Sequence, residues 1–196
     1  MLENIIVREL KATDDLEKAA ELFYESGSKM YDLVFGDKAT AITYLSKLIR
    51  EENNIYSHKT CIVAFKNQQI CGLVSSYNKD NINNAEMGKD FMKVLKFFNM
   101  MKLFISSRKI KELDDFSDVD GYYVQAVCVD EDYRKMGIAS KLLEYCFNKQ
   151  KENLYLDVEA DNYNAIALYN KYGFKKIRDI NVKYTNSPYI RMKKCG

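Results

Sequence analysis

The sequence predicts one α/β domain with a mixed sheet, and three observations support this prediction. Short runs rich in β-branched residues, such as "TCIVAFK" and "YYVQAVCV", are typical of strands. Longer runs with apolar residues three and four positions apart are typical of helices. The two kinds of run alternate along the 196 residues in the order β-α-α-β-β, helical insert, β-α-β-α-β-β, without a repeat or a linker.

The first half of the chain predicts a strand, two helices and a hairpin. Residues 4–10 ("NIIVREL") form the strand, and Thr13 is the expected N-cap of a helix over 14–26. A second helix covers 38–51, because its apolar residues share one face. The runs "TCIVAFK" and "ICGLVSSY" flank the polar turn "NQQ", a pattern typical of an antiparallel hairpin.

Residues 78–120 form an insert between the hairpin and the next strand. Two polar loops flank a single expected helix over 88–109. Its apolar positions at helical spacing are Phe91, Val94, Leu95, Phe98, Met101 and Ile105. Interspersed lysines indicate that the other side of this helix faces solvent.

The second half alternates strands and helices. The strand "YYVQAVCV" (122–129) precedes the helix "SKLLEYCFNKQ" (140–150), and the strand "LYLDVEA" (154–160) precedes the helix "NAIALYNKYG" (164–173). Two further strand-like runs, "GFKKIRDI" and "PYIRMKK", end the chain.

The composition argues against several classes of protein. Thirty basic and 28 acidic residues leave a net charge of +2, which gives no reason to expect a nucleic-acid or membrane partner. Residues 1–10 lack the apolar segment of a signal peptide, and no apolar run approaches the ~18 residues of a membrane helix, so we expect a cytoplasmic protein. Five cysteines without a C-x-x-C pair, and the single His58, indicate reduced thiols and no metal site.

A short motif lies where the strand 122–129 turns into the next helix. Residues 134–139 read R-x-x-G-x-A, with Gly137 free to bring the backbone close to a ligand. The first N–H groups of a helix are unpaired and lie at its positive end, so they suit a pyrophosphate, and Arg134 and Lys135 add charge. The spacing alone leaves open both a phosphate site and an ordinary strand–helix turn.

The stretch from Arg134 to Phe174 resembles the GNAT N-acetyltransferase superfamily. The matches are "VCVDEDYRKMGIASKLL", "LYLDVEADNYNAIALYNKYGF" and the closing "YIRMKK". The resemblance implies a twisted, mostly antiparallel sheet flanked by helices, in which two parallel strands splay apart, with the helical insert before the fourth strand. It also implies an enzyme that transfers the acetyl group of acetyl-CoA to a primary amine by direct attack in a ternary complex. The acceptor would be a small molecule, an amino acid or a peptide N-terminus.

The resemblance assigns the cofactor-binding residues. The strand 122–129 would splay from 154–160, so that backbone groups of Val127, Cys128 and Val129 pair with the pantetheine arm. Asn162 matches an asparagine that contacts the CoA arm. The backbone amides that would hold the pyrophosphate, beside the Arg134 side chain, are those of Lys135, Met136, Gly137, Ile138 and Ala139.

The resemblance also assigns catalytic groups. Tyr169 matches the tyrosine near the thioester sulfur, where a hydroxyl can protonate the leaving thiolate. A backbone N–H, expected to be that of Val129, would stabilise the developing oxyanion. Asp157 matches the base of ribosomal-protein alanine acetyltransferases and ranks before Glu159 and a water relay. Strand alternation places both carboxylates on one face, where a purely solvated role is the alternative.

Two other functions stay open from the residues. One is a non-catalytic acyl-CoA-binding or scaffold protein with the same fold, and the other is transfer of a longer acyl group. The insert is a candidate for a cap over the acceptor site or for a homodimer contact. We hypothesise that Phe91, Phe98 and Met101 line or cover the acceptor pocket.

Overall fold

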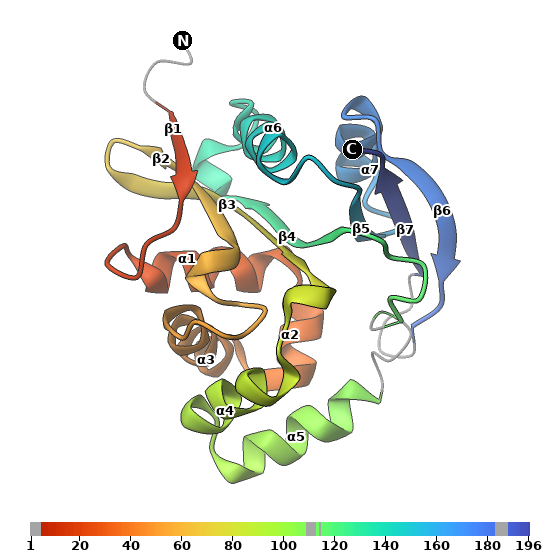
Figure 1. The fold of residues 1–196 in the computed structure, drawn as a ribbon. Helices are drawn as coiled ribbons and strands as arrows, with labels where there is room; N and C mark the ends of the chain where they lie inside the picture. Colours follow the sequence, from red (N-terminus) through yellow and green to blue (C-terminus); the bar gives the residue numbers. More distant parts are fainter. Residues whose placement is uncertain (1–4, 109–112, 114, 183–187) are drawn as a thin grey trace.

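The computed structural model describes residues 5–108, 113, 115–182 and 188–196, and centres on one twisted sheet (Figure 1). Seven strands form this sheet in the order β1-β2-β3-β4-β5-β7-β6. Their bounds are β1 Ile6–Glu9, β2 Cys61–Lys66, β3 Gln69–Asn78, β4 Tyr122–Val129, β5 Leu154–Glu159, β6 Lys175–Ile180 and β7 Tyr189–Lys194. Only β4 and β5 pair in parallel within this sheet, which confirms the expected mixed, mostly antiparallel architecture.

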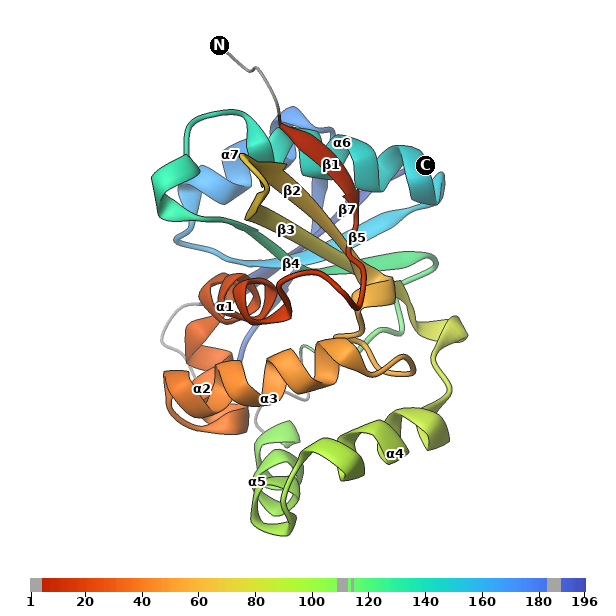
Figure 2. The same cartoon turned by 90° about the vertical axis from the view of Figure 1, so that its left-hand side faces the viewer.

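Helices cover both faces of the sheet (Figure 2). On one face lie α6 and α7, and on the other lies α1, with α2 to α5 beyond it. Their bounds are α1 Leu16–Ser26, α2 Ser28–Phe35, α3 Lys38–Arg50, α4 Asn84–Val94, α5 Phe97–Ser107, α6 Ile138–Gln150 and α7 Tyr163–Lys171. Each face has its own buried apolar cluster, one built on α1 and α3 and the other on α6. No helix in the described ranges is long and apolar enough to cross a bilayer.

The hairpin of β2 and β3 is confirmed, and its turn explains its register. Asn67 and Gln68 form the two-residue loop with φ of 51° and 66°. Positive φ at both positions is the signature of a type I′ turn, whose twist matches that of the flanking strands. The turn places β3 in the centre of the sheet, between β2 and β4.

The beginning of the chain differs from the prediction in two places. Asp15, not Thr13, caps α1, because its side chain accepts a hydrogen bond from the N–H of Lys18 at 3.0 Å. No helix was predicted over Ser28–Phe35, where α2 lies. Gly27 ends α1 but starts α2 as well, since its carbonyl accepts from the N–H of Met30 and Tyr31.

Within its described residues, the insert (78–120) contains two α-helices where one over 88–109 was expected. Asn83 caps α4, and its side chain accepts from two backbone N–H groups. Leu95 and Lys96 are then extended, with ψ of 135° and 156°, which separates α4 from α5. The apolar spacing runs on across this break without a proline or glycine, so the pattern carries no signal for it.

Candidate functional site

β4 and β5 pair only over their first residues and then diverge. Their register ends at Val124 opposite Leu156. At the same point the pairing of β4 with β3 passes from Val124 to Ala126, so Gln125 is an extra residue in β4. This bulge turns the following side chains over: Val124 packs in the cluster of α6, whereas Ala126 packs in that of α1. Bulges are common beside active sites because they redirect a strand.

Beyond the bulge, the edge of β4 that faces away from β3 has no partner strand among the described residues. The N–H of Asp130 donates to the carbonyl of Cys71 at 3.1 Å, so by alternation Cys128 also directs its backbone groups at β3. Val127 and Val129 therefore direct theirs at the open edge. Arg134 Nε donates to the Val129 carbonyl at 3.1 Å, which leaves the Val129 N–H at this edge.

The divergence of the strands creates a cavity of about 290 Å³, here called the splay cavity. It brings together five of the residues selected from the sequence, Val127, Asp157, Glu159, Asn162 and Tyr169. The corner between α1 and α2 forms the opposite wall. The other predicted cofactor-binding residues, 128–129 and 134–139, lie outside this lining.

Tyr169 projects from α7 into the splay cavity. Its ring packs against Phe174 with centroids 5.8 Å apart, and the residue is 8% exposed. Burial raises the pKa of the Tyr169 hydroxyl, which therefore keeps its proton at neutral pH. Asn162 begins the same helix, and its Oδ1 accepts from the N–H of Ala165 at 3.2 Å. Asn162 thus fixes the helix that carries Tyr169.

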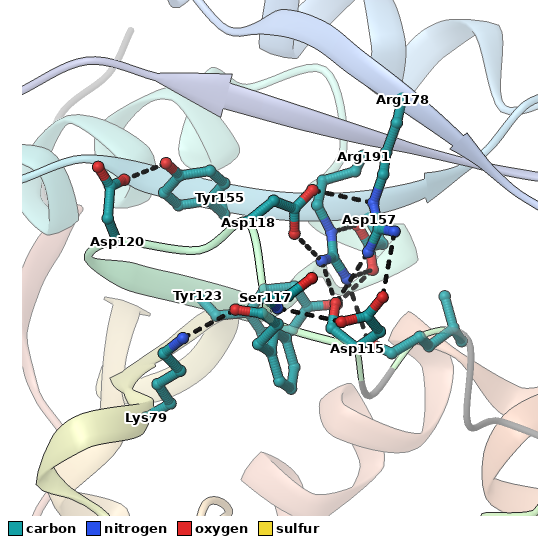
Figure 3. A network of polar contacts seen from close by, with 12 residues as sticks. Lys79, Asp115, Ser117, Asp118, Asp120, Tyr123, Tyr155, Asp157, Arg178 and Arg191 are labelled. Atoms are coloured by element: carbon teal, nitrogen blue, oxygen red, sulfur yellow. Dashed lines mark hydrogen bonds and ion pairs between the residues drawn. The ribbon is translucent and has the colours of Figure 1, made fainter.

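Asp157 forms a buried ion pair with Arg191 that was not predicted from the sequence (Figure 3). Its Oδ1 and Oδ2 accept from Nε and Nη2 of Arg191, each at 2.8 Å, and Oδ2 also accepts from the Tyr123 hydroxyl at 3.2 Å. The Asp157 side chain is 2% exposed and that of Arg191 is fully buried. Burial raises the pKa of Asp157, and the guanidinium opposes that rise. The sequence did contain a signal for this pair: an acidic residue in "LYLDVEA" and a basic residue in "YIRMKK", two runs that pair in the sheet with Asp157 opposite Arg191.

Arg191 uses all five of its N–H donors (Figure 3). Two go to Asp157, one goes to Asp118 Oδ1 at 2.7 Å, and two go to the carbonyls of Leu113 and Asp115. Arg178 of β6 adds an ion pair to Asp118 with 2.9 Å between Nε and Oδ2. These bonds fasten the end of the insert to β5, β6 and β7.

Glu159 is the more open of the two predicted carboxylates. Its side chain is 26% exposed. The Tyr189 hydroxyl donates to its Oε1 at 3.1 Å, and Lys29 Nζ lies 3.3 Å from Oε2. Since Lys29 belongs to α2, this pair spans the splay cavity between α2 and β5.

The R-x-x-G-x-A motif forms a turn with two left-handed residues. Lys135 has φ of 62° and Gly137 has φ of 74°, and α6 begins directly after Gly137. No described side chain caps this helix start. Successive N–H groups in such a turn form a concave anion site, and the helix dipole adds to it. The residues present therefore fit a pyrophosphate, beside the open edge of β4.

A second, larger cavity of about 590 Å³ lies between the sheet and the insert and is here called the insert cavity. Phe91, one of the three residues expected at the acceptor pocket, lines this cavity. Met101 does not: it is 47% exposed, and Met100 and Leu103 of the same helix line the cavity instead. The side chain of Phe98 lies outside the described residues.

Comparisons with known proteins give a consistent family and fold. The model of the acetyltransferase (GNAT) family matches residues 27–174. An N-alpha-acetyltransferase of Saccharolobus solfataricus is 41% identical over 69 residues, which are 33% of this chain and 41% of that protein. The chain thus spans about two fifths of the curated relatives it matches.

Two solved structures share the fold at low identity. An N-acetyltransferase from Staphylococcus aureus Mu50 superposes with a TM-score of 0.74 at 19% identity, over 96% of this chain and all of that one. A chain of the NatC complex bound to Gag peptide and CoA gives a TM-score of 0.54 at 15% identity, over 98% of each chain.

Proposed function

Because the chain belongs to the acetyltransferase (GNAT) family, we propose that it transfers the acetyl group of acetyl-CoA to a primary amine. The carrying observation is the divergence of β4 from β5. It leaves a strand edge open beside the splay cavity, and it brings Tyr169 and two carboxylates to the same cavity. The names of the curated relatives favour the α-amine of a peptide N-terminus among the possible acceptors.

Acetyl-CoA supplies the activated thioester, and the chain supplies its binding site. The turn at 135–139 is proposed to hold the pyrophosphate through backbone N–H groups, with Arg134 close by. The backbone groups of Val127 and Val129 are proposed to pair with the pantetheine arm, because strand pairing leaves them directed at the open edge. Cys128 lies between them, and its backbone groups pair with β3 instead of pointing at the open edge.

The remaining groups handle charge and protons. The Val129 N–H is proposed to donate to the oxygen on which negative charge develops when the amine attacks. The protonated Tyr169 hydroxyl is proposed to donate to the leaving sulfur. Both steps use groups held by the fold, on β4 and on α7, so little rearrangement is needed during transfer.

Asp157 and Glu159 are the candidates for the proton acceptor, and their ion-pair partners favour one of the two. Protonating Asp157 would deprive the buried Arg191 cation of a carboxylate, and breaking such a pair costs about 3–5 kcal/mol. Glu159 is partly exposed and its partner Lys29 lies at 3.3 Å, so it can take up a proton at lower cost. We therefore place Glu159 before Asp157, and give Asp157 a positioning role.

Calorimetric titration with acetyl-CoA tests the binding site. We expect the wild-type protein to bind and Gly137→Glu not to bind, because the new side chain adds bulk and negative charge at the anion site. The matched control is Gly173→Glu. Gly173 also has a positive φ, of 86°, and a Cβ there meets nothing within 4 Å, so the control carries the same backbone strain away from the site.

Release of free CoA thiol in the presence of amines then tests transfer. Turnover that Gly137→Glu abolishes and Gly173→Glu retains is the expected result. Binding of acetyl-CoA without turnover of any amine would favour the non-catalytic acyl-CoA-binding alternative. Binding of equal affinity to all three proteins would mean that the pyrophosphate lies elsewhere.

A further inference from the structure

We propose that the acceptor amine carries a bulky apolar group, aromatic or large aliphatic, which binds in the insert cavity. This inference rests on the proposed transfer reaction and names the class of its acceptor. It follows from the lining of the cavity, from its charge, and from its position next to the splay cavity.

The lining of the insert cavity is mainly apolar. Six aromatic residues contribute to it, Tyr31, Tyr56, Tyr77, Phe91, Phe116 and Tyr123. These rings pack on one another: Tyr56 lies 6.2 Å from both Tyr31 and Phe91, and Tyr123 lies 4.8 Å from Phe116. A volume of about 590 Å³ walled by packed rings suits a rigid apolar group.

The charges around this cavity disfavour a polar or polycationic acceptor. Among the described residues that line the cavity, Lys79 is the one charged residue, and Lys79 Nζ already donates to the carbonyl of Phe116 at 2.8 Å. None of these described lining residues is a carboxylate that could neutralise a second ammonium group. A diamine would therefore bury an unpaired cation, which is strongly unfavourable.

The insert cavity adjoins the splay cavity. Gln125, the bulge residue of β4, lines both. Tyr123 lines the insert cavity, while its hydroxyl donates to Asp157, which lines the splay cavity. The proposal therefore places the apolar group in the insert cavity and directs its amine past Gln125 towards the carboxylates of the splay cavity.

The insert provides one wall, and one position in it allows a clean test. Gly88 of α4 lines the cavity, and a Cβ built there meets nothing within 4 Å. A Cβ can therefore be added here without displacing a neighbour, and we expect the ring of phenylalanine to extend into the cavity; replacing glycine within a helix also favours folding. Met92 of the same helix is 65% exposed and lies outside the lining, so Met92→Phe is the matched control.

The experiment measures kcat/KM for ethylamine, isoamylamine, phenethylamine and 1,4-diaminobutane, and for short peptides that begin with Gly, Leu or Phe. We expect the bulky apolar amines to exceed ethylamine and the diamine by about a hundredfold, since one methylene group alone discriminates about 10–200-fold in an apolar pocket. The peptide and free-amine arms show which source of the same apolar group is used. The inference would be overturned if small and bulky acceptors gave equal kcat/KM within every series, free amines or peptides, that is turned over.

Gly88→Phe is expected to lower kcat/KM for phenethylamine at least about tenfold. Its kcat/KM for ethylamine should fall by less than that for phenethylamine, whereas all values for the control Met92→Phe should stay unchanged. An equal loss for every amine would contradict the inference. If no amine turns over, phenethylamine binding is measured by calorimetry in the presence of CoA. Binding that Gly88→Phe weakens would then support the cavity while refuting transfer, and absence of binding would refute the cavity.

Discussion

Arg191→Met tests whether the buried ion pair holds the site together. The substitution keeps an unbranched chain of similar length and removes the cation from between Asp157 and Asp118. It leaves the Asp157 carboxylate buried with only the Tyr123 hydroxyl as a donor among the described residues. We therefore expect a large loss of stability rather than the small effect of a surface charge.

The magnitude follows from the burial of both partners. Five charge-assisted hydrogen bonds at about 1.5–3 kcal/mol each would together equal the whole stability of a typical domain, about 5–15 kcal/mol. Desolvation of the guanidinium and the carboxylate offsets most of that sum, so the loss expected for breaking a buried pair is about 3–5 kcal/mol. For a chain of this size, that corresponds to a drop in Tm of about 6–20 °C.

Urea unfolding of Arg191→Met, Asp157→Leu and the double variant measures this loss. Because the double variant no longer buries an unpaired charge, the two effects should be non-additive by about 1–3 kcal/mol. Burial raises the pKa of Asp157 in the folded state and the Arg191 guanidinium opposes that rise, so the pKa of Asp157 is higher still in Arg191→Met. A buried carboxyl with a raised pKa destabilises the folded state increasingly as the pH rises through that pKa. The deficit of Arg191→Met should therefore be larger at pH 8 than at pH 5. Additive losses that do not depend on pH would refute the reasoning.

Two further predictions concern the chemistry. Tyr169→Phe should lower kcat by about 10²-fold or more and leave the Kd for acetyl-CoA unchanged, because it removes the proton donor but keeps the ring; wild-type turnover would exclude Tyr169 as the acid. Glu159→Gln should lower kcat/KM by about 10²-fold or more, because it removes the proposed base, whereas Asp157→Asn should lower it less. The opposite result would return Asp157 to the role of base.

The part of the site that the sequence predicted is the part that local backbone geometry determines. The turn around Gly137 and the helix carrying Tyr169 each depend on residues close together in the chain. The edge of β4 was also anticipated, because the resemblance includes the order of the strands. In these places a short motif is sufficient to specify the backbone.

The part that was missed depends on pairing between distant residues. Asp157 and Arg191 lie 34 positions apart, and their contact requires the register of β5 with β7. The break at Leu95 depends on how α4 and α5 pack, since the apolar spacing continues through it. Of the residues that line the insert cavity, Phe91 alone was named from the sequence as a pocket residue. Other walls come from α2, from residues 55–56 before β2, and from β4, which are distant in the chain.

The two ends of the insert meet at one point of the sheet. Asn78, the last residue of β3, lies opposite Tyr122, the first residue of β4. In chain-topology terms, everything between them is the loop of a hairpin, and lengthening such a loop costs only about 0.6 kcal/mol per doubling. The wall that the insert contributes to the insert cavity is thus a module that could be exchanged while the open edge of β4 stays in place. An exchanged module must also bring an acidic residue equivalent to Asp118, since Arg191 would otherwise lose that partner.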